Sequence, residues 1–88
     1  AARGVDVAVL ALGETGYAEW IGDIADLALP PRQRELARAV QATGTPTVLV
    51  LLAGRPRLVR ELVDPAGAVV LAYWPGMEGG AALGEVLF

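Results

Sequence analysis

The sequence contains neither cysteine nor histidine. Without cysteine there are no disulfide bonds and no thiolate chemistry, and without histidine there is no Ser-His-Asp or Cys-His catalysis and no histidine metal site. Lysine is also missing, so every basic side chain is one of seven arginines. Acid–base chemistry in this chain must therefore use carboxyl groups or, less favourably, tyrosine. The sequence predicts no metal ion and no cofactor.

The chain also lacks the marks of two kinds of partner. Its net charge is −3 and its arginines form no basic block or stripe, which argues against nucleic acid. No apolar run reaches the roughly 18 residues that are needed to cross a bilayer. The first ten residues, AARGVDVAVL, have none of the parts of a signal peptide. The compartment stays open: a periplasmic or secreted parent protein and a cytoplasmic one both fit.

Apolar residues, in contrast, are abundant. They make up 55% of the 88 residues, and the mean hydropathy is +0.49. A domain of this size buries only roughly 60–65% of its unfolded surface, so a small independent domain is usually more polar. We therefore expect residues 1–88 to be a single partial domain whose remaining apolar surface faces other parts of a longer protein.

Three apolar runs alternate with helical patterns. We expect strands over 5–12, 46–52 and 68–73, the first of them buried on both faces. We expect helices from 30 or 31 to the Gly44 stop, over 56–62, and from 77 or 78 to 87. In the first helix, Leu36, Ala37 and Val40 are expected to share the apolar face. The order β-α-β-α-β-α without a hairpin signal predicts an α/β fold with a parallel sheet and right-handed crossovers.

In parallel α/β sheets, ligands bind beyond the carboxyl ends of the strands. The segments that leave those ends here are GETGYAEWIGD, AGRP and YWPGMEGG. We expect them to form one carboxyl-end rim. Its candidate functional side chains are Glu14, Glu19, Asp23, Arg55, Trp74 and Glu78. Carboxylates, an arginine and aromatic rings suit a sugar, because rings stack on pyranose faces and charged groups hydrogen-bond to hydroxyls.

Simpler structural roles compete with each of these candidates. Glu14 directly follows a strand, where capping of backbone amides is the more economical interpretation, and aspartates such as Asp23 and Asp26 commonly cap turns. Arg55 fits equally well as a pin between its loop and a carbonyl or carboxylate, and Trp20 as loop packing. The glycines of the last helix, at positions 79, 80 and 84, indicate close helix packing rather than a phosphate loop. From the residues alone, Glu19 is one of several candidates.

The run GETGYAEWIGDIADLALPPRQ resembles a loop in the C-terminal α/β sandwich domain of family 3 glycoside hydrolases, the β-glucosidase and exo-glucanase group. The family pattern there is GE-x-x-Y-x-E-x-x-GD, followed by L-x-L-P and a glutamine. The positions that match in order are Gly13, Glu14, Tyr17, Glu19, Gly22, Asp23, Leu27, Leu29, Pro30 and Gln33. Further on, AGRP resembles the family's SGRP, with Ala53 for serine, and PGMEGG with the terminal VLF resembles its last turn and helix. Trp20, Ile21 and Ile24 depart from the smaller or more polar residues that are usual there.

The resemblance implies a function as well as a fold. The fold would be part of a six-stranded α/β/α sandwich, and the enzyme a retaining β-glycosidase that hydrolyses O-glycosidic bonds of a β-linked oligosaccharide or glucoside. Glu19 would be the general acid/base, screened from water by the rings of Tyr17 and Trp20, and the nucleophile would be an aspartate on a separate N-terminal (β/α)8 barrel, absent from this chain. Trp20 would contact substrate. The residues that would support the loop are Glu14, Tyr17, Asp23 and Arg55.

Two other functions remain open at this stage. The first is a noncatalytic α/β binding or scaffold module that keeps the sheet and acts through interaction. The second is a nucleotide-binding domain, which is disfavoured because no glycine-rich phosphate loop directly follows the first strand. An upstream barrel with an aspartate at the end of its seventh strand would favour the enzyme over the module.

Overall fold

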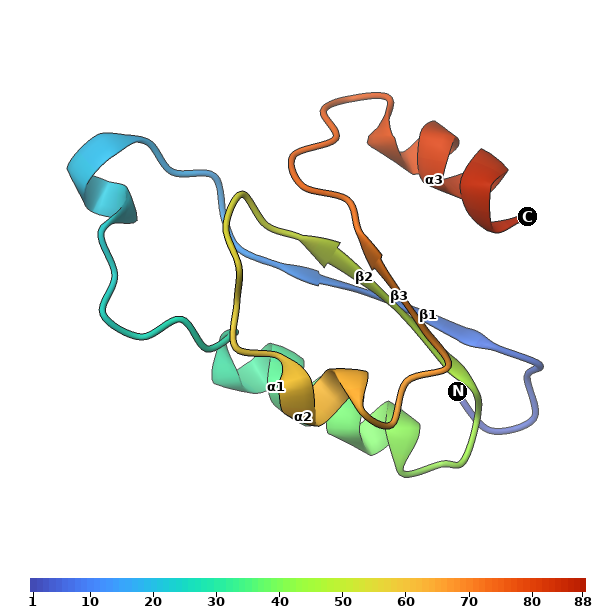
Figure 1. Ribbon diagram of the computed structural model, residues 1–88. Coiled ribbons are helices and arrows are strands. Elements are labelled where there is room, and N and C mark those ends of the chain that lie inside the picture. Colours follow the sequence, from blue (N-terminus) through green and yellow to red (C-terminus); the bar gives the residue numbers. More distant parts are fainter.

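The computed structural model describes residues 1–88. Its elements are β1 (Ala8–Gly13), the short 3-10 helix η1 (Glu19–Gly22), α1 (Pro31–Gln41), β2 (Thr47–Leu52), α2 (Arg60–Val63), β3 (Ala68–Leu71) and α3 (Gly79–Leu87). The strands are parallel and lie in the order β1-β2-β3, with α1 and α2 on one face of the sheet and α3 on the other (Figure 1). The predicted parallel α/β architecture is confirmed.

The outer strands are shorter than predicted. Residues 5–7 lie outside β1, because the only neighbour of β1 is β2, and β2 begins at Thr47 opposite Ala8. The preceding Pro46 accepts a hydrogen bond from the Ala8 amide at 2.9 Å but has no N–H to offer in return. At the other end, β3 stops at Leu71, and Tyr73 with a φ of 56° cannot continue an extended strand.

The helix starts were predicted with mixed success. Helix α1 begins at Pro31 as expected, since proline suits a position whose N–H would have no partner. The second helix was expected from Pro56 but begins only at Arg60. The intervening chain is extended instead, because Leu58 forms a parallel bridge with Ala28 and donates its N–H to the Leu27 carbonyl at 3.0 Å. No helix in the structure combines the length and the apolarity that a membrane span requires.

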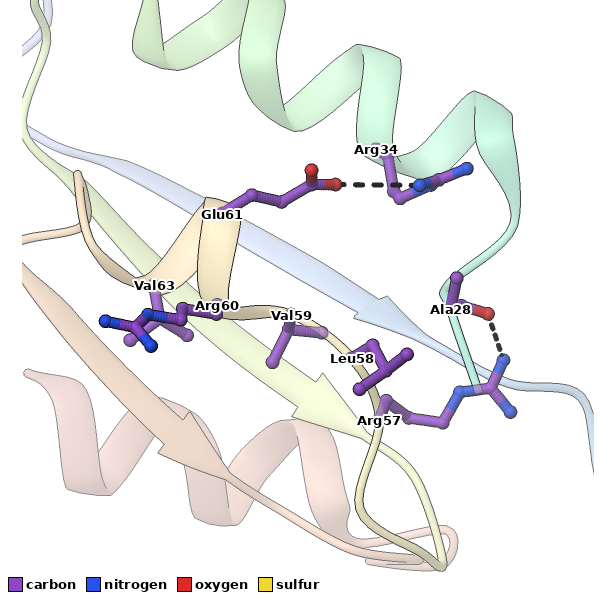
Figure 2. A pocket seen from close by; sticks show the side chains of 8 residues that line it. All are labelled: Ala28, Arg34, Arg57, Leu58, Val59, Arg60, Glu61 and Val63. Atoms are coloured by element: carbon purple, nitrogen blue, oxygen red, sulfur yellow. Dashed lines mark hydrogen bonds and ion pairs between the residues drawn. The ribbon is translucent and has the colours of Figure 1, made fainter. Parts of the chain in front are cut away.

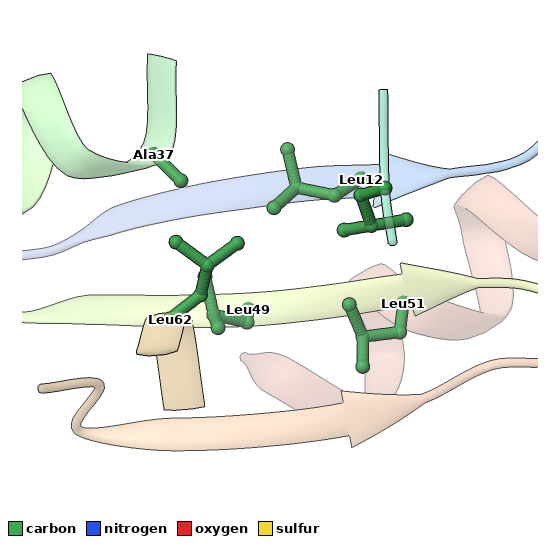
Figure 3. Packing of buried hydrophobic residues seen from close by; sticks show 6 residues of the cluster. Leu12, Ala37, Leu49, Leu51 and Leu62 are labelled. Atoms are coloured by element: carbon green, nitrogen blue, oxygen red, sulfur yellow. The ribbon is translucent and has the colours of Figure 1, made fainter. Parts of the chain in front are cut away.

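The core lies between the sheet and the layer of α1 and α2 (Figure 3). Its buried members are Leu12, Leu29, Ala37, Leu49, Leu51 and Leu62. The apolar face predicted for α1 is wrong at Leu36, which is 54% exposed, whereas its neighbour Ala37 is fully buried. The small Ala37 side chain lets α1 approach the sheet closely.

Burial on both faces, predicted for the first strand, is wrong for β1, and only the central strand β2 is buried in this way. The edge strands each have one neighbour, so Val9 and Leu71 are 42% and 47% exposed. Helix α3 covers little of the second face. A methyl group at Gly80 or Gly84 would meet no atom within 4 Å, so the close-packing explanation of these two glycines is wrong within this chain. It holds only for Gly79, where a methyl group would lie 2.6 Å from Pro75.

Candidate active site

Three loops meet at the carboxyl end of the sheet: residues 14–30 after β1, 53–59 after β2 and 72–78 after β3 (Figure 1). The chain's two non-glycine residues with positive φ, Glu19 at 54° and Tyr73 at 56°, both lie in these loops. A left-handed backbone costs such a residue about 1–2 kcal/mol, and strain of this kind tends to gather at functional sites. The sequence-based prediction that the loops form one rim is confirmed.

Glu14 is the centre of the contacts that join the first two loops. Its side chain is only 8% exposed. Oε1 accepts hydrogen bonds from the Gly54 amide at 3.0 Å and from the Tyr17 hydroxyl at 3.2 Å. Oε2 pairs with Arg57 Nη1 at 2.8 Å and with Arg55 Nε at 3.5 Å. Both oxygens are thus occupied, and the interpretation of Glu14 as a cap of nearby backbone is confirmed.

Arg57 is a site residue that sequence reasoning missed. Its side chain is 8% exposed, and besides pairing with Glu14 it donates a hydrogen bond to the Ala28 carbonyl at 2.5 Å. The sequence pattern directed attention to AGRP, which stops one residue short of it. The available signal was that Glu14, next to a buried strand end, requires a counter-charge, and that Arg57 stands beside the corresponding end of β2.

Arg55 makes several contacts with the loop after β1. Its Nε donates to the Tyr17 hydroxyl at 2.7 Å, its guanidinium carbon lies 3.9 Å from the centre of the Tyr17 ring, and its Nη1 donates to the Gly22 carbonyl at 2.6 Å. The Trp74 ring meets Tyr17 edge-on, with the centroids 5.6 Å apart. The interpretation of Arg55 as a loop pin is confirmed, and Trp74 reaches the rim as predicted.

Glu19 has very different surroundings from Glu14. It is exposed at the start of η1, and its side chain forms no hydrogen bond or ion pair within the chain. It borders an open cavity of about 420 Å³, the Glu19 cavity. The residues that line this cavity are Tyr17, Ala18, Glu19, Gly22, Asp23 and Arg55. Glu19 is therefore free to exchange a proton with a ligand in this space.

Other predicted positions fared differently. Trp20 is 76% exposed, so it neither packs into its loop nor, in this chain, shields Glu19 from water; Tyr17 turns instead toward Arg55 and Trp74. Asp26 caps its turn by accepting the Ala28 amide at 2.8 Å, as predicted. Asp23 borders the Glu19 cavity, whereas Glu78, exposed at the start of α3, does not.

A second cavity, of about 500 Å³, lies on the helical side of the sheet (Figure 2). Its lining residues are Ala28, Arg34, Arg57, Leu58, Val59, Arg60, Glu61 and Val63. The one carboxylate there, Glu61, is paired with Arg38 at 2.6 Å and with Arg34 at 3.7 Å. Because this cavity offers no free acid or base, we assign the candidate chemistry to the rim.

These features define a class of protein: an open parallel α/β sheet whose carboxyl-end loops hold one glutamate in ion pairs and leave another free. Residues 1–88 match the model of the glycosyl hydrolase family 3 C-terminal domain, and the chain belongs to this family. The family resemblance noted in the sequence is thereby confirmed.

Named relatives agree with this assignment. The chain is 41% identical over 87 residues to a lysosomal beta glucosidase of Dictyostelium discoideum and 39% identical over 89 residues to a periplasmic beta-glucosidase of Salmonella typhimurium. These matches cover 98% and 100% of the chain but only 11% and 12% of the relatives. The structure of a Listeria innocua beta-glucosidase in complex with glucose is 38% identical, with a TM-score of 0.87 over 97% of this chain and 12% of that one. The chain thus spans about one eighth of the proteins it resembles.

Proposed function

We propose that this chain is part of a retaining β-glycosidase and that Glu19 is its general acid/base. The observation that carries the proposal is the contrast between the two glutamates of GETGYAE. Glu14 is held by two arginines and a backbone amide, whereas Glu19 is unpaired and borders an open cavity. Relatives named as beta-glucosidases and beta-xylosidases support the same class of reaction.

The proposed reaction has two steps. In the first, a carboxylate nucleophile attacks the anomeric carbon, the bond to the leaving oxygen breaks, and Glu19 gives its proton to that oxygen. In the second, water attacks the same carbon, Glu19 takes a proton from the water, and the bond to the nucleophile breaks. Two inversions leave the sugar with its original β configuration. The two carboxyl groups must stand about 5–5.5 Å apart for this mechanism.

The mechanism needs a second carboxyl group, because one cannot perform both roles. The family resemblance implies that this nucleophile would come from a separate (β/α)8 barrel in the same longer protein. The substrate, a β-linked oligosaccharide or glucoside, would lie between the barrel and the Glu19 cavity. Trp20 would stack on such a sugar, a proposal that its 76% exposure and its position next to Glu19 support.

The test is Glu19→Ala in the longer protein that contains this chain. We expect the rate to fall by about 10²–10⁴ for aryl β-glucosides whose leaving groups need a proton, and the first step to be nearly unchanged for a dinitrophenyl glucoside, whose leaving group needs none. Asp23→Ala is the matched control, because Asp23 borders the same cavity. If the rate loss depends on the leaving group in the Asp23 variant and not in the Glu19 variant, the acid/base is Asp23 and our assignment of Glu19 is wrong.

A further inference from the structure

We infer that Arg55 is a positioning residue for Glu19, because one guanidinium holds the loop on both sides of it. This inference rests on the proposed role of Glu19 as the acid/base. Arg55 would not touch the reacting atoms. It would act by fixing the backbone from which the Glu19 carboxyl group projects.

Glu19 needs such support of its backbone because no group in the chain holds its side chain. The carboxyl group has no hydrogen-bond partner, and the residue has a φ of 54°, which only the surrounding structure can maintain. Within this chain, the backbone is therefore the only constraint on where the carboxyl group can lie. Catalysis is sensitive to this position, since a misplacement of about 1 Å can cost about 10²-fold in rate.

Arg55 contacts the chain two residues before and three residues after Glu19. On the near side, it donates to the Tyr17 hydroxyl at 2.7 Å and stacks over the Tyr17 ring at 3.9 Å. On the far side, it donates to the Gly22 carbonyl at 2.6 Å. The two ends of the short segment 17–22 are thereby tied to the same rigid, planar group.

The two sides of the segment also lock together. A methyl group at Gly22 would stand 2.4 Å from the Tyr17 ring and 3.2 Å from Arg55 Nη2, so these three residues are packed without spare room. The Trp74 ring also packs against the Tyr17 ring in a T-shaped arrangement. Arg55 itself is oriented by Glu14, whose Oε2 lies 3.5 Å from its Nε.

Lysine cannot replace this arrangement. Arg55 bonds through two nitrogens that point in different directions and presents a flat face to an aromatic ring, whereas an ammonium group is a compact point charge. Arg55→Lys would keep the charge near Glu14 but lose at least one of the two ties. The Glu19 turn would then relax and the carboxyl group would move.

The experiment measures kcat/KM of the longer protein for a series of aryl β-glucosides, because this ratio reports the first step. We expect Arg55→Lys to reduce kcat/KM about 10- to 100-fold for poor leaving groups and to leave it nearly unchanged for a dinitrophenyl leaving group. Tyr17→Phe, which removes one hydroxyl, should give a smaller loss with the same dependence. Arg60→Lys is the matched control, since that side chain is 92% exposed and its ion pair is with Asp64 at the end of α2, not with the loop that carries Glu19; it should behave as the unaltered protein.

The outcomes separate the inference from the function beneath it. If the loss of kcat/KM in Glu19→Ala depends on the leaving group but Arg55→Lys slows all substrates equally, the proposed function stands and the positioning role is overturned. If Glu19→Ala shows no such dependence, the proposed function fails and takes the inference with it. Should Arg55→Lys not fold, Tyr17→Phe decides, and an unaltered leaving-group dependence in that variant would overturn the inference.

Discussion

Glu14 and Glu19 show how five positions along one loop decide the role of a carboxyl group. Glu14 directly follows Gly13, which pairs with Leu52, so the strand register places it beside the loop after β2 and its arginines. Glu19 stands in a short turn beyond that reach. The capping role of Glu14 was predictable because it depends on the nearby strand end. Its pairing with Arg57 was open only to an argument from the adjacent strand ends, because a contact between residues 43 positions apart leaves no local pattern.

Glu14→Gln should lower the free energy of unfolding by about 3–5 kcal/mol, because it leaves the buried Arg57 guanidinium without its counter-charge. Denaturant unfolding of the longer protein checks this. Glu35→Gln, on the exposed side of α1, is the control and should change stability by less than about 0.5 kcal/mol. Equal effects in the two variants would show that the Glu14 ion pairs contribute little.

At the scale of elements, apolar runs and proline positions indicated three strands and the start of α1, while the strand ends were set by pairing. The apolar run at 5–12 continues before Ala8, but no strand lies opposite it there. The start of α2 moved to Arg60 because Leu58 pairs with Ala28, a contact that turn residues cannot reveal. Periodicity finds an element, and its neighbours decide where it begins and ends.

Two glycines test how the elements pack. A methyl group at Gly54 would stand 1.8 Å from Trp74 Nε1, so Gly54→Ala should displace the indole and lower stability by about 1–3 kcal/mol. Gly84 lies inside α3, and a methyl group added there would meet no atom within 4 Å. Gly84→Ala should therefore raise stability by about 1 kcal/mol. Thermal unfolding of both variants of the longer protein gives the signs. A loss of stability in Gly84→Ala would show that another part of that protein packs against α3.

On the scale of the whole molecule, the parallel architecture followed from the order of elements, but the degree of burial did not. Only 11 of 88 residues are buried, because one helical layer cannot cover both faces of a sheet that has open edges on β1 and β3. Trp20 was expected to shield Glu19 from water but does not, for the same reason: the chain has no second layer over the rim. Both features fit the proposal that further parts of a longer protein complete the domain.

We therefore expect the isolated 88-residue chain to associate in solution. Its edge strands and its exposed side chains, such as Trp20 at 76% and Met77 at 99%, favour intermolecular contacts. Sedimentation at micromolar concentration should show oligomers or aggregates. A concentration-independent monomer with a cooperative thermal transition would show that the chain needs no covering partner.

The measurement that tests the central claim most directly is azide rescue of Glu19→Ala in the longer protein, with the product identified by nuclear magnetic resonance. Without its base, the variant should accumulate the glycosyl-enzyme from a dinitrophenyl β-glucoside. Azide attacks without a base and fits the space that the carboxyl group vacates. We predict restored turnover and a glycosyl azide of β configuration, with no azide product from Asp23→Ala. Rescue of the Asp23 variant, or no azide product from the Glu19 variant, would contradict the assignment of Glu19 as the general acid/base.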